Sequence, residues 1–207
     1  YAAAFDKSAE KAGVDTNYTH EIFKAFVAGR KIITAANGAK LSDKDRAALV
    51  ALAAKIETTW KTVLAEAVFK YAGSVLKDMS KLQVIVDANG DTKKQFAKYV
   101  KHWGELKGFS LALQLGRKDL GETAAKLNRL IGAGPLLFNA SQVVDIDRSG
   151  NYLRDQGETW AGYMVHMAKI QRLMVSAFAV KVKANDATSK LSRLVNAAGG
   201  GGNSEND

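Results

Sequence analysis

The chain contains no cysteine and only one proline, Pro135. Without cysteine it has no disulfide bond, no thiol nucleophile and no Cys-ligated zinc or iron–sulfur centre. A single proline argues against an all-β fold with many turns and leaves room for long uninterrupted helices. The sequence also lacks a run of 18 apolar residues, a Gly-x-Ser-x-Gly motif and a phosphate-binding glycine loop. These absences exclude a membrane-spanning helix and the common serine-hydrolase and nucleotide-binding signatures.

Of the 207 residues, 47% are hydrophobic and 25% are charged. This apolar content is sufficient for a sizeable core, and the length corresponds to one domain. We therefore expect a single helical domain over residues 1–198. The remaining segment, 199–207, is rich in glycine and polar residues and is expected to be a flexible tail.

The strongest periodic pattern runs from Leu49 to Met79, where apolar residues recur every three or four positions. Ser42 and Asp45 supply a capping signal before it, so the pattern predicts a helix over 43–79. Such a helix is about 55 Å long, and we expect a kink near Gly73. The β-branched run 82–86 is interpreted as a connector.

Three other segments carry the same periodicity over a long stretch, and each begins with a capping signal. Asn17 is the expected N-cap of the first, Thr92 and Gln95 form a capping box for the second, and Asp155 and Glu158 are expected to cap the last. A shorter helix is expected over 120–131, and a loop over 138–152. The pattern predicts an all-α fold, an up-and-down bundle of four long helices with one or two shorter ones.

His102 and Glu105 are the first candidate metal ligands. A spacing of three places both side chains on one face of a helix, where an imidazole nitrogen and a carboxylate oxygen can share a divalent metal ion. Two ligands do not complete a site, and Glu66 is the predicted third, with Glu21 and His166 as further choices. The alternative is structural: His102 lies at the edge of the apolar stripe, and Glu105 pairs with Lys101 one turn earlier.

A second candidate site is a calcium loop that begins at Asp145. The segment matches an EF-hand loop at positions one, three, five, six and eight, and the candidate calcium ligands are Asp145, Asp147, Ser149 and Asn151. Position twelve is Gln156 and lacks the bidentate carboxylate of that loop. The interpretation as Asx-type turns before a capped helix therefore ranks ahead of calcium binding.

The chain has 30 Lys and Arg residues against 21 Asp and Glu residues, a formal net charge of +9. Lys94, Lys98 and Lys101 share one helical face in the densest basic stretch. A solvated helix face is the first interpretation. The alternative is an interaction surface for an anionic polymer, such as a polysaccharide, a lipid headgroup layer or a nucleic acid.

Three motifs together resemble a known family. They are IFKAFVAGRKII at 22–33, WKTVLA starting at Trp60, and HWGELKGF at 102–109. In this order and spacing they are similar to the C-terminal half of an imelysin-like family of bacterial envelope lipoproteins, a domain of unknown function, and the similarity extends over residues 17–180. The resemblance implies an all-α bundle located in the periplasm or on the outer cell surface, with relatives linked to iron acquisition.

The motif Gly-x-His-x-x-Glu is typical of imelysin-like proteins. His102 and Glu105 match it, whereas Val100 replaces the glycine and Lys61 replaces an expected acidic residue. The resemblance implies a non-catalytic envelope protein that binds a metal ion, linked to iron, or a small ligand around His102, Glu105 and Arg30. An alternative for Arg30 is that it caps the C-terminal end of its helix. The peptidase activity attributed to related proteins has no support in these motifs.

Overall fold

The computed structural model describes residues 1–115, 120–156 and 158–188. Its elements are α1 (Ala2–Lys11), α2 (Tyr18–Ala36), α3 (Asp43–Asp87), α4 (Lys93–Gln114), α5 (Gly121–Ile131), β1 (Ser141–Ile146), β2 (Tyr152–Gln156) and α6 (Trp160–Phe178). The prediction of an all-α fold with four long helices and two shorter ones is confirmed. The predicted tail 199–207 lies outside the described residues.

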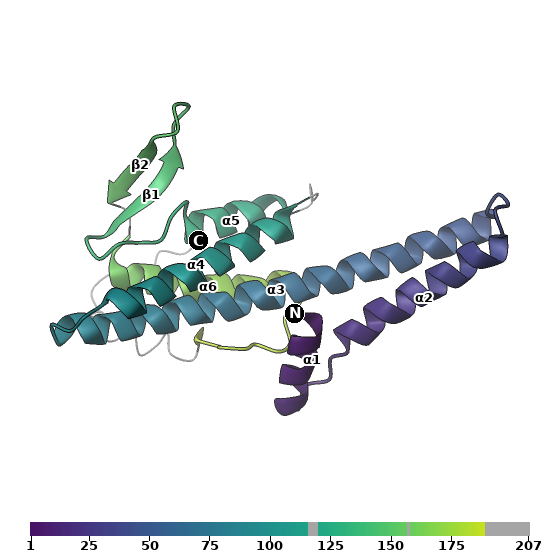
Figure 1. The fold of residues 1–207 in the computed structure, drawn as a ribbon, viewed down its shortest axis with the longest axis horizontal. Coiled ribbons are helices and arrows are strands. Elements are labelled where there is room, and N and C mark those ends of the chain that lie inside the picture. The colour runs from purple at the N-terminus through teal and green to yellow at the C-terminus, as the bar shows by residue number, and fades with distance from the viewer. Residues whose placement is uncertain (116–119, 157, 189–207) are drawn as a thin grey trace.

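Helix α3 forms the axis of the molecule (Figure 1). It begins as predicted, because the Ser42 side chain accepts a hydrogen bond from the Asp45 amide. It stays helical through Gly73 and continues to Asp87, so the connector predicted over 82–86 is wrong. Leu82 in this last stretch is fully buried, and the packing gained there outweighs the low helix propensity of its β-branched neighbours. At 1.5 Å per residue, the 45-residue helix is about 68 Å long.

The second half of α3 packs against α4 and α6, which both run antiparallel to it, and α5 packs on α6 (Figure 1). This part of the chain is the body of the molecule. Its core is formed by fully buried aromatic and aliphatic side chains from these four helices, among them Phe69, Met79, Tyr99, Leu127 and Tyr163. No helix within the described ranges is long and apolar enough to cross a membrane.

The first half of α3 packs mainly against α2, and the two helices project from the body as an arm, residues 18–62 (Figure 1). Between Ala25 and Val63 no residue is buried. The four long helices therefore do not form one compact bundle. Three of them surround the core, and α2 extends away from it along α3.

Asp6 in α1 caps the N-terminus of α2. Its carboxylate accepts hydrogen bonds from the Tyr18 amide at 2.8 Å and the Thr19 amide at 2.9 Å. Asn17 occupies the N-cap position as predicted, but its side chain makes no capping hydrogen bond. Burial raises the pKa of the Asp6 carboxyl, and hydrogen bonds from Thr19, Tyr18 and Thr16 outweigh burial, so that the pKa lies below its usual range. The side chain that caps α2 thus belongs to a residue that precedes Tyr18 by twelve positions in the sequence.

We expect Asp6→Ala to lower the free energy of unfolding by about 1 kcal/mol, the usual cost of a lost N-cap. Because the folded-state pKa of Asp6 is depressed, its contribution is complete above the unfolded pKa and is lost as pH falls through the folded pKa. Urea titrations at pH 7 and at pH 3 test this, and the difference between wild type and variant should shrink at pH 3. Asn17→Ala is the matched control and should change little. Equal effects of the two substitutions would contradict the assignment.

Two other predicted caps are wrong. Gln95 donates to Asp78 on α3 instead of closing a capping box, and the Asp91 carboxylate accepts from the Lys93 amide at the start of α4. At the start of α6, the Thr159 hydroxyl accepts from the Gly162 amide at 3.0 Å.

Strands β1 and β2 pair antiparallel in the segment where a loop was predicted over 138–152. The hairpin turns at Gly150, whose φ of 84° suits glycine. All five residues of β2 are exposed, so the hairpin projects from the body (Figure 1). Asp155 lies in β2 and does not cap α6.

Candidate functional site

His102 on α4 pairs with Asp78 on α3. The imidazole Nδ1 contacts Asp78 Oδ2, and the Asp78 side chain is only 2% exposed. Gln95 Nε2 donates to the second oxygen, Asp78 Oδ1, at 2.9 Å. Because a carboxylate accepts hydrogen bonds, this contact places a hydrogen on Nδ1 of His102, and Nε2 is the ring nitrogen outside this contact. The pair therefore orients the imidazole and fixes its tautomer.

Glu105 lies one turn after His102 and next to Tyr71 of α3. Its Oε2 atom is buried and has no hydrogen-bond partner among the described residues. Burial raises the pKa of the Tyr71 phenol, and the neighbouring Tyr1 hydroxyl, at 2.8 Å, and the Glu105 carboxylate raise it further. The Tyr71 ring lies 6.0 Å from the His102 ring. The site therefore combines an oriented imidazole with a buried carboxylate oxygen that lacks a partner.

The structure keeps the predicted third ligand, Glu66, away from this site. Glu66 precedes Asp78 by twelve residues on the same helix, which corresponds to about 18 Å. Its Oε1 accepts hydrogen bonds from the Tyr18 hydroxyl and from the Lys181 and Val182 amides. The other choices are also engaged elsewhere, Glu21 with Lys55 and His166 with Glu158. Within the described ranges, no group of three His, Asp or Glu side chains is arranged to hold a metal ion.

The predicted calcium loop is the turn of the β-hairpin. Asp147 Oδ1 accepts hydrogen bonds from the Ser149 and Asn151 amides, and its Oδ2 accepts from Asn151 Nδ2. These bonds lower the pKa of the Asp147 carboxyl. Asp145 accepts from the amide that follows it, in β1. The carboxylate that would bind calcium thus stabilises an Asx-type turn, which lies in a hairpin and not before a helix.

Arg30 lies on α2, in the arm and far from His102 along the chain. It is exposed and lies more than one turn before the end of α2, since the last turn of that helix contains no basic residue. It therefore does not cap the helix, and it lines a groove between α2 and α3.

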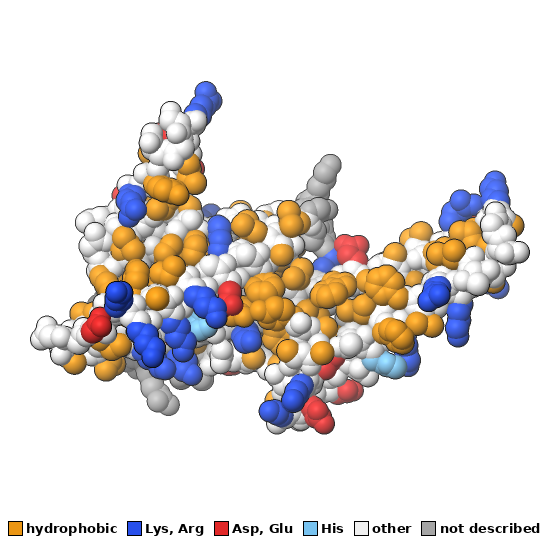
Figure 2. Space-filling model, in the orientation of Figure 1, with side chains coloured by type: hydrophobic (Ala, Val, Ile, Leu, Met, Phe, Trp, Pro, Cys, Tyr) orange, Lys and Arg blue, Asp and Glu red, His pale blue; other side chains and the backbone are white. Residues whose placement is uncertain are grey.

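The three lysines of the predicted basic face, Lys94, Lys98 and Lys101, are all exposed on α4. Figure 2 shows Lys and Arg side chains gathered over this part of the body. Lys77 and Lys81 of α3 are exposed as well. None of these five cations forms an ion pair within the part of the chain that the structure describes.

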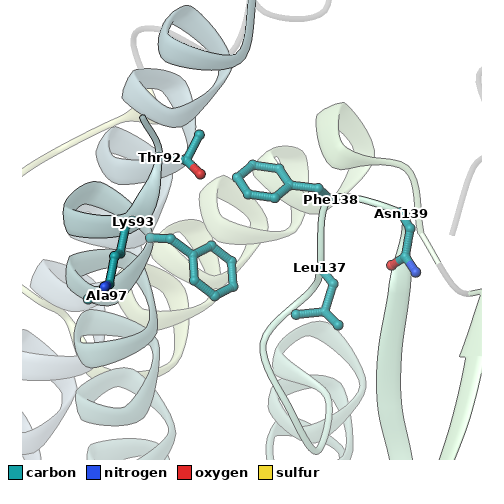
Figure 3. Close-up of a pocket in the computed structure, with 7 residues that line it drawn as sticks. Thr92, Lys93, Ala97, Leu137, Phe138 and Asn139 are labelled. Carbon is teal, nitrogen blue, oxygen red and sulfur yellow. The ribbon is translucent and has the colours of Figure 1, made fainter. Parts of the chain in front are cut away.

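A separate pocket lies between the start of α4 and the segment before β1 (Figure 3). Its volume is about 650 Å³, and its lining residues are Thr92, Lys93, Phe96, Ala97, Leu137, Phe138 and Asn139. The Phe138 ring stacks on Trp160 at 5.2 Å. None of the predicted site residues lines this pocket.

Sequence reasoning missed Asp78 and Tyr71. A signal for Asp78 was present, because an acidic residue inside the apolar stripe of a long helix is buried and needs a partner.

Comparisons of the chain with protein-family models, with curated proteins and with solved structures found no match.

Proposed function

We propose that this chain is a non-catalytic protein of the bacterial cell envelope, located in the periplasm or on the outer surface, that binds a divalent metal ion through His102 and Glu105. The observation that carries the proposal is the Asp78–His102 pair beside the partnerless oxygen of Glu105. The imelysin-like resemblance supports the location and makes iron the expected metal.

The residues fit a metal ion in two respects. Histidine ligands commonly donate their second ring N–H to a carboxylate, which is the relation of His102 to Asp78. An imidazole and a carboxylate are donors that suit iron or zinc, whereas calcium prefers oxygen ligands alone. With only His102 and Glu105 as protein ligands, the remaining coordination positions of the metal ion would be filled by water or by a small ligand. Asp78 is a positioning residue in this proposal.

We expect the purified chain to contain metal by mass spectrometry, and added iron or zinc to raise its melting temperature. At a concentration of 100 times Kd, a bound metal stabilises the native state by about 2.7 kcal/mol. His102→Ala and Glu105→Gln should abolish the shift. Asp78→Asn should weaken metal affinity by about 10- to 100-fold, since the ligand loses its orienting carboxylate.

His20→Ala is the matched control, because His20 is exposed on the arm and should not affect the metal. Metal retained in His102→Ala would refute the site. If calcium alone raises the melting temperature and His102→Ala keeps that effect, the turn at Asp147 is the site instead. No melt shift and no metal content would exclude metal binding.

The second candidate function is binding of an anionic polymer. The observation that favours it is the set of five exposed lysines of α3 and α4 without ion pairs in the described structure. Binding of heparin as a probe polymer should then fall steeply with salt, and the triple change of Lys94, Lys98 and Lys101 to Gln should reduce the slope of that dependence.

A further inference from the structure

The arm carries an apolar groove on one side. The groove has a volume of about 340 Å³ and is lined by residues of both helices: Ala25, Phe26, Gly29, Arg30, Ile33 and Thr34 of α2, and Leu49, Leu52, Ala53 and Ile56 of α3. At Gly29 the two helices are close, since a Cβ there would lie 3.4 Å from Leu49 Cδ2. The groove thus has a floor formed where two antiparallel helices meet.

Large apolar side chains of the groove face are exposed to solvent. Phe26 and Ile33 are each 59% exposed, and Trp60, one turn after Ile56 on the same face of α3, is 45% exposed. Figure 2 shows hydrophobic side chains continuing along the arm. A contiguous exposed apolar patch of this kind marks an interaction surface. An arm without a buried residue between Ala25 and Val63 also gains little stability from its own packing.

The shape and charge of the groove indicate which kind of partner fits it. A groove between two antiparallel helices accepts the apolar stripe of a third helix, whereas a membrane surface is flat. Arg30 is the only charged residue that lines the groove, and it has no ion pair in the described part of the chain. A carboxylate on the occupant would pair with it.

A second copy of this chain fits less well. Residues 18–60 contain seven Lys and Arg residues against four Asp and Glu residues, so two arms packed groove to groove would bring like charges together. We propose that the groove binds an amphipathic helix of a partner protein, whose apolar stripe lies between α2 and α3 and whose acidic flank pairs with Arg30. This inference does not depend on the metal site.

The test uses the full chain and two designed peptides of about 18 residues, roughly five helical turns. Both carry leucines at helical i, i+3, i+4 and i+7 spacing. One has glutamates along the flanks, and the other has lysines at the same positions. Fluorescence anisotropy at physiological salt, where exposed charges are screened, measures binding of each labelled peptide. We expect the acidic peptide to bind, and the tryptophan emission, to which the exposed Trp60 beside the groove contributes, to shift to shorter wavelength.

Two variants locate the contact. Phe26→Asp should weaken binding of the acidic peptide by about tenfold or more, as expected for a central apolar anchor. Arg30→Glu should reverse the preference so that the lysine peptide binds better. Val50→Asp is the matched control, because Val50 is 66% exposed but does not line the groove, and it should leave binding unchanged.

Four results would overturn the proposal. The first is that neither peptide binds, and the second is that binding is unaffected by Phe26→Asp. The third is self-association of the chain that Phe26→Asp abolishes, which would assign the groove to a second copy. The fourth is sedimentation with anionic phosphatidylglycerol vesicles that Phe26→Asp abolishes while neither peptide binds, which would assign the face to a membrane.

Discussion

Gly73→Ala should destabilise the protein by about 3 kcal/mol or more, although alanine is the better helix former by about 1 kcal/mol. A Cβ at position 73 would lie 1.8 Å from the Asn185 carbonyl oxygen and 2.7 Å from Gln171 Nε2. The first of these atoms belongs to the backbone and cannot move away by a rotamer change. The segment after α6 would have to lift off α3, together with the Gln171 bonds to Phe69 and Asn185.

Thermal and urea unfolding measure the effect of this substitution. For a chain of this length, a loss of about 3 kcal/mol corresponds to a fall in Tm of roughly 6 to 12 °C. Gly104→Ala is the matched control, because Gly104 also lies inside a helix but has nothing within 4 Å of an added Cβ. It should stabilise the protein by about 0.5 to 1 kcal/mol. A Gly73→Ala variant as stable as the wild type would mean that the Asn185 segment does not pack on α3.

Glu66→Ala is the second substitution with a large expected effect, a loss of about 3 to 5 kcal/mol. Glu66 is fully buried, and its Oε1 accepts from the Tyr18 hydroxyl at 3.1 Å and from the Lys181 and Val182 amides at 2.7 and 2.9 Å. Alanine would leave three donors without an acceptor, two of them buried, and create a cavity. The loss should appear in urea unfolding as a lower midpoint without a change in slope.

Glu66→Gln separates this role from a role in metal binding. Glutamine keeps one acceptor oxygen for the same donors, so it should retain most of the stability that alanine loses. Glu10→Ala, an exposed change on α1, should leave the melting temperature unchanged. If Glu66→Gln instead removed bound metal while leaving stability intact, Glu66 would be a ligand after all, as the sequence analysis expected.

The local pattern predicted helices well and their environment poorly. Apolar spacing identified α3 from Leu49 onward, and it placed Trp60 on the same stripe as the core residues. Yet Trp60 is 45% exposed, because this half of α3 packs mainly against α2 and lies outside the main core. A periodic stripe indicates which face of a helix is apolar, but what covers that face depends on the other helices.

Contacts between distant residues account for the remaining differences. The cap of α2 comes from Asp6, and no pattern near Asn17 encodes it. In the candidate site, the spacing of His102 and Glu105 predicted that both lie on one face of a helix, and the structure shows that this face of α4 contacts Asp78 and Tyr71 of α3. An acidic residue in the stripe of α3 could have been noticed, but the pairing of Asp78 with His102 depends on the register between the two helices. The β-hairpin was missed because β2 is exposed on both faces and β1 is covered only at its start, so neither strand has the alternation that identifies a half-buried strand.

The bonds of Glu66 also set an order of events during synthesis. The Lys181 amide that Glu66 accepts from lies 115 residues further along the chain. At about 5 to 20 residues per second, a ribosome takes roughly 6 to 23 s to make that stretch. Throughout this interval the Glu66 carboxylate at the centre of α3 lacks two of its hydrogen-bond donors, because the Lys181 and Val182 amides have not yet been synthesised. The core around Glu66 therefore cannot form completely until the segment that contains Lys181 and Val182, which follows α6, has been synthesised.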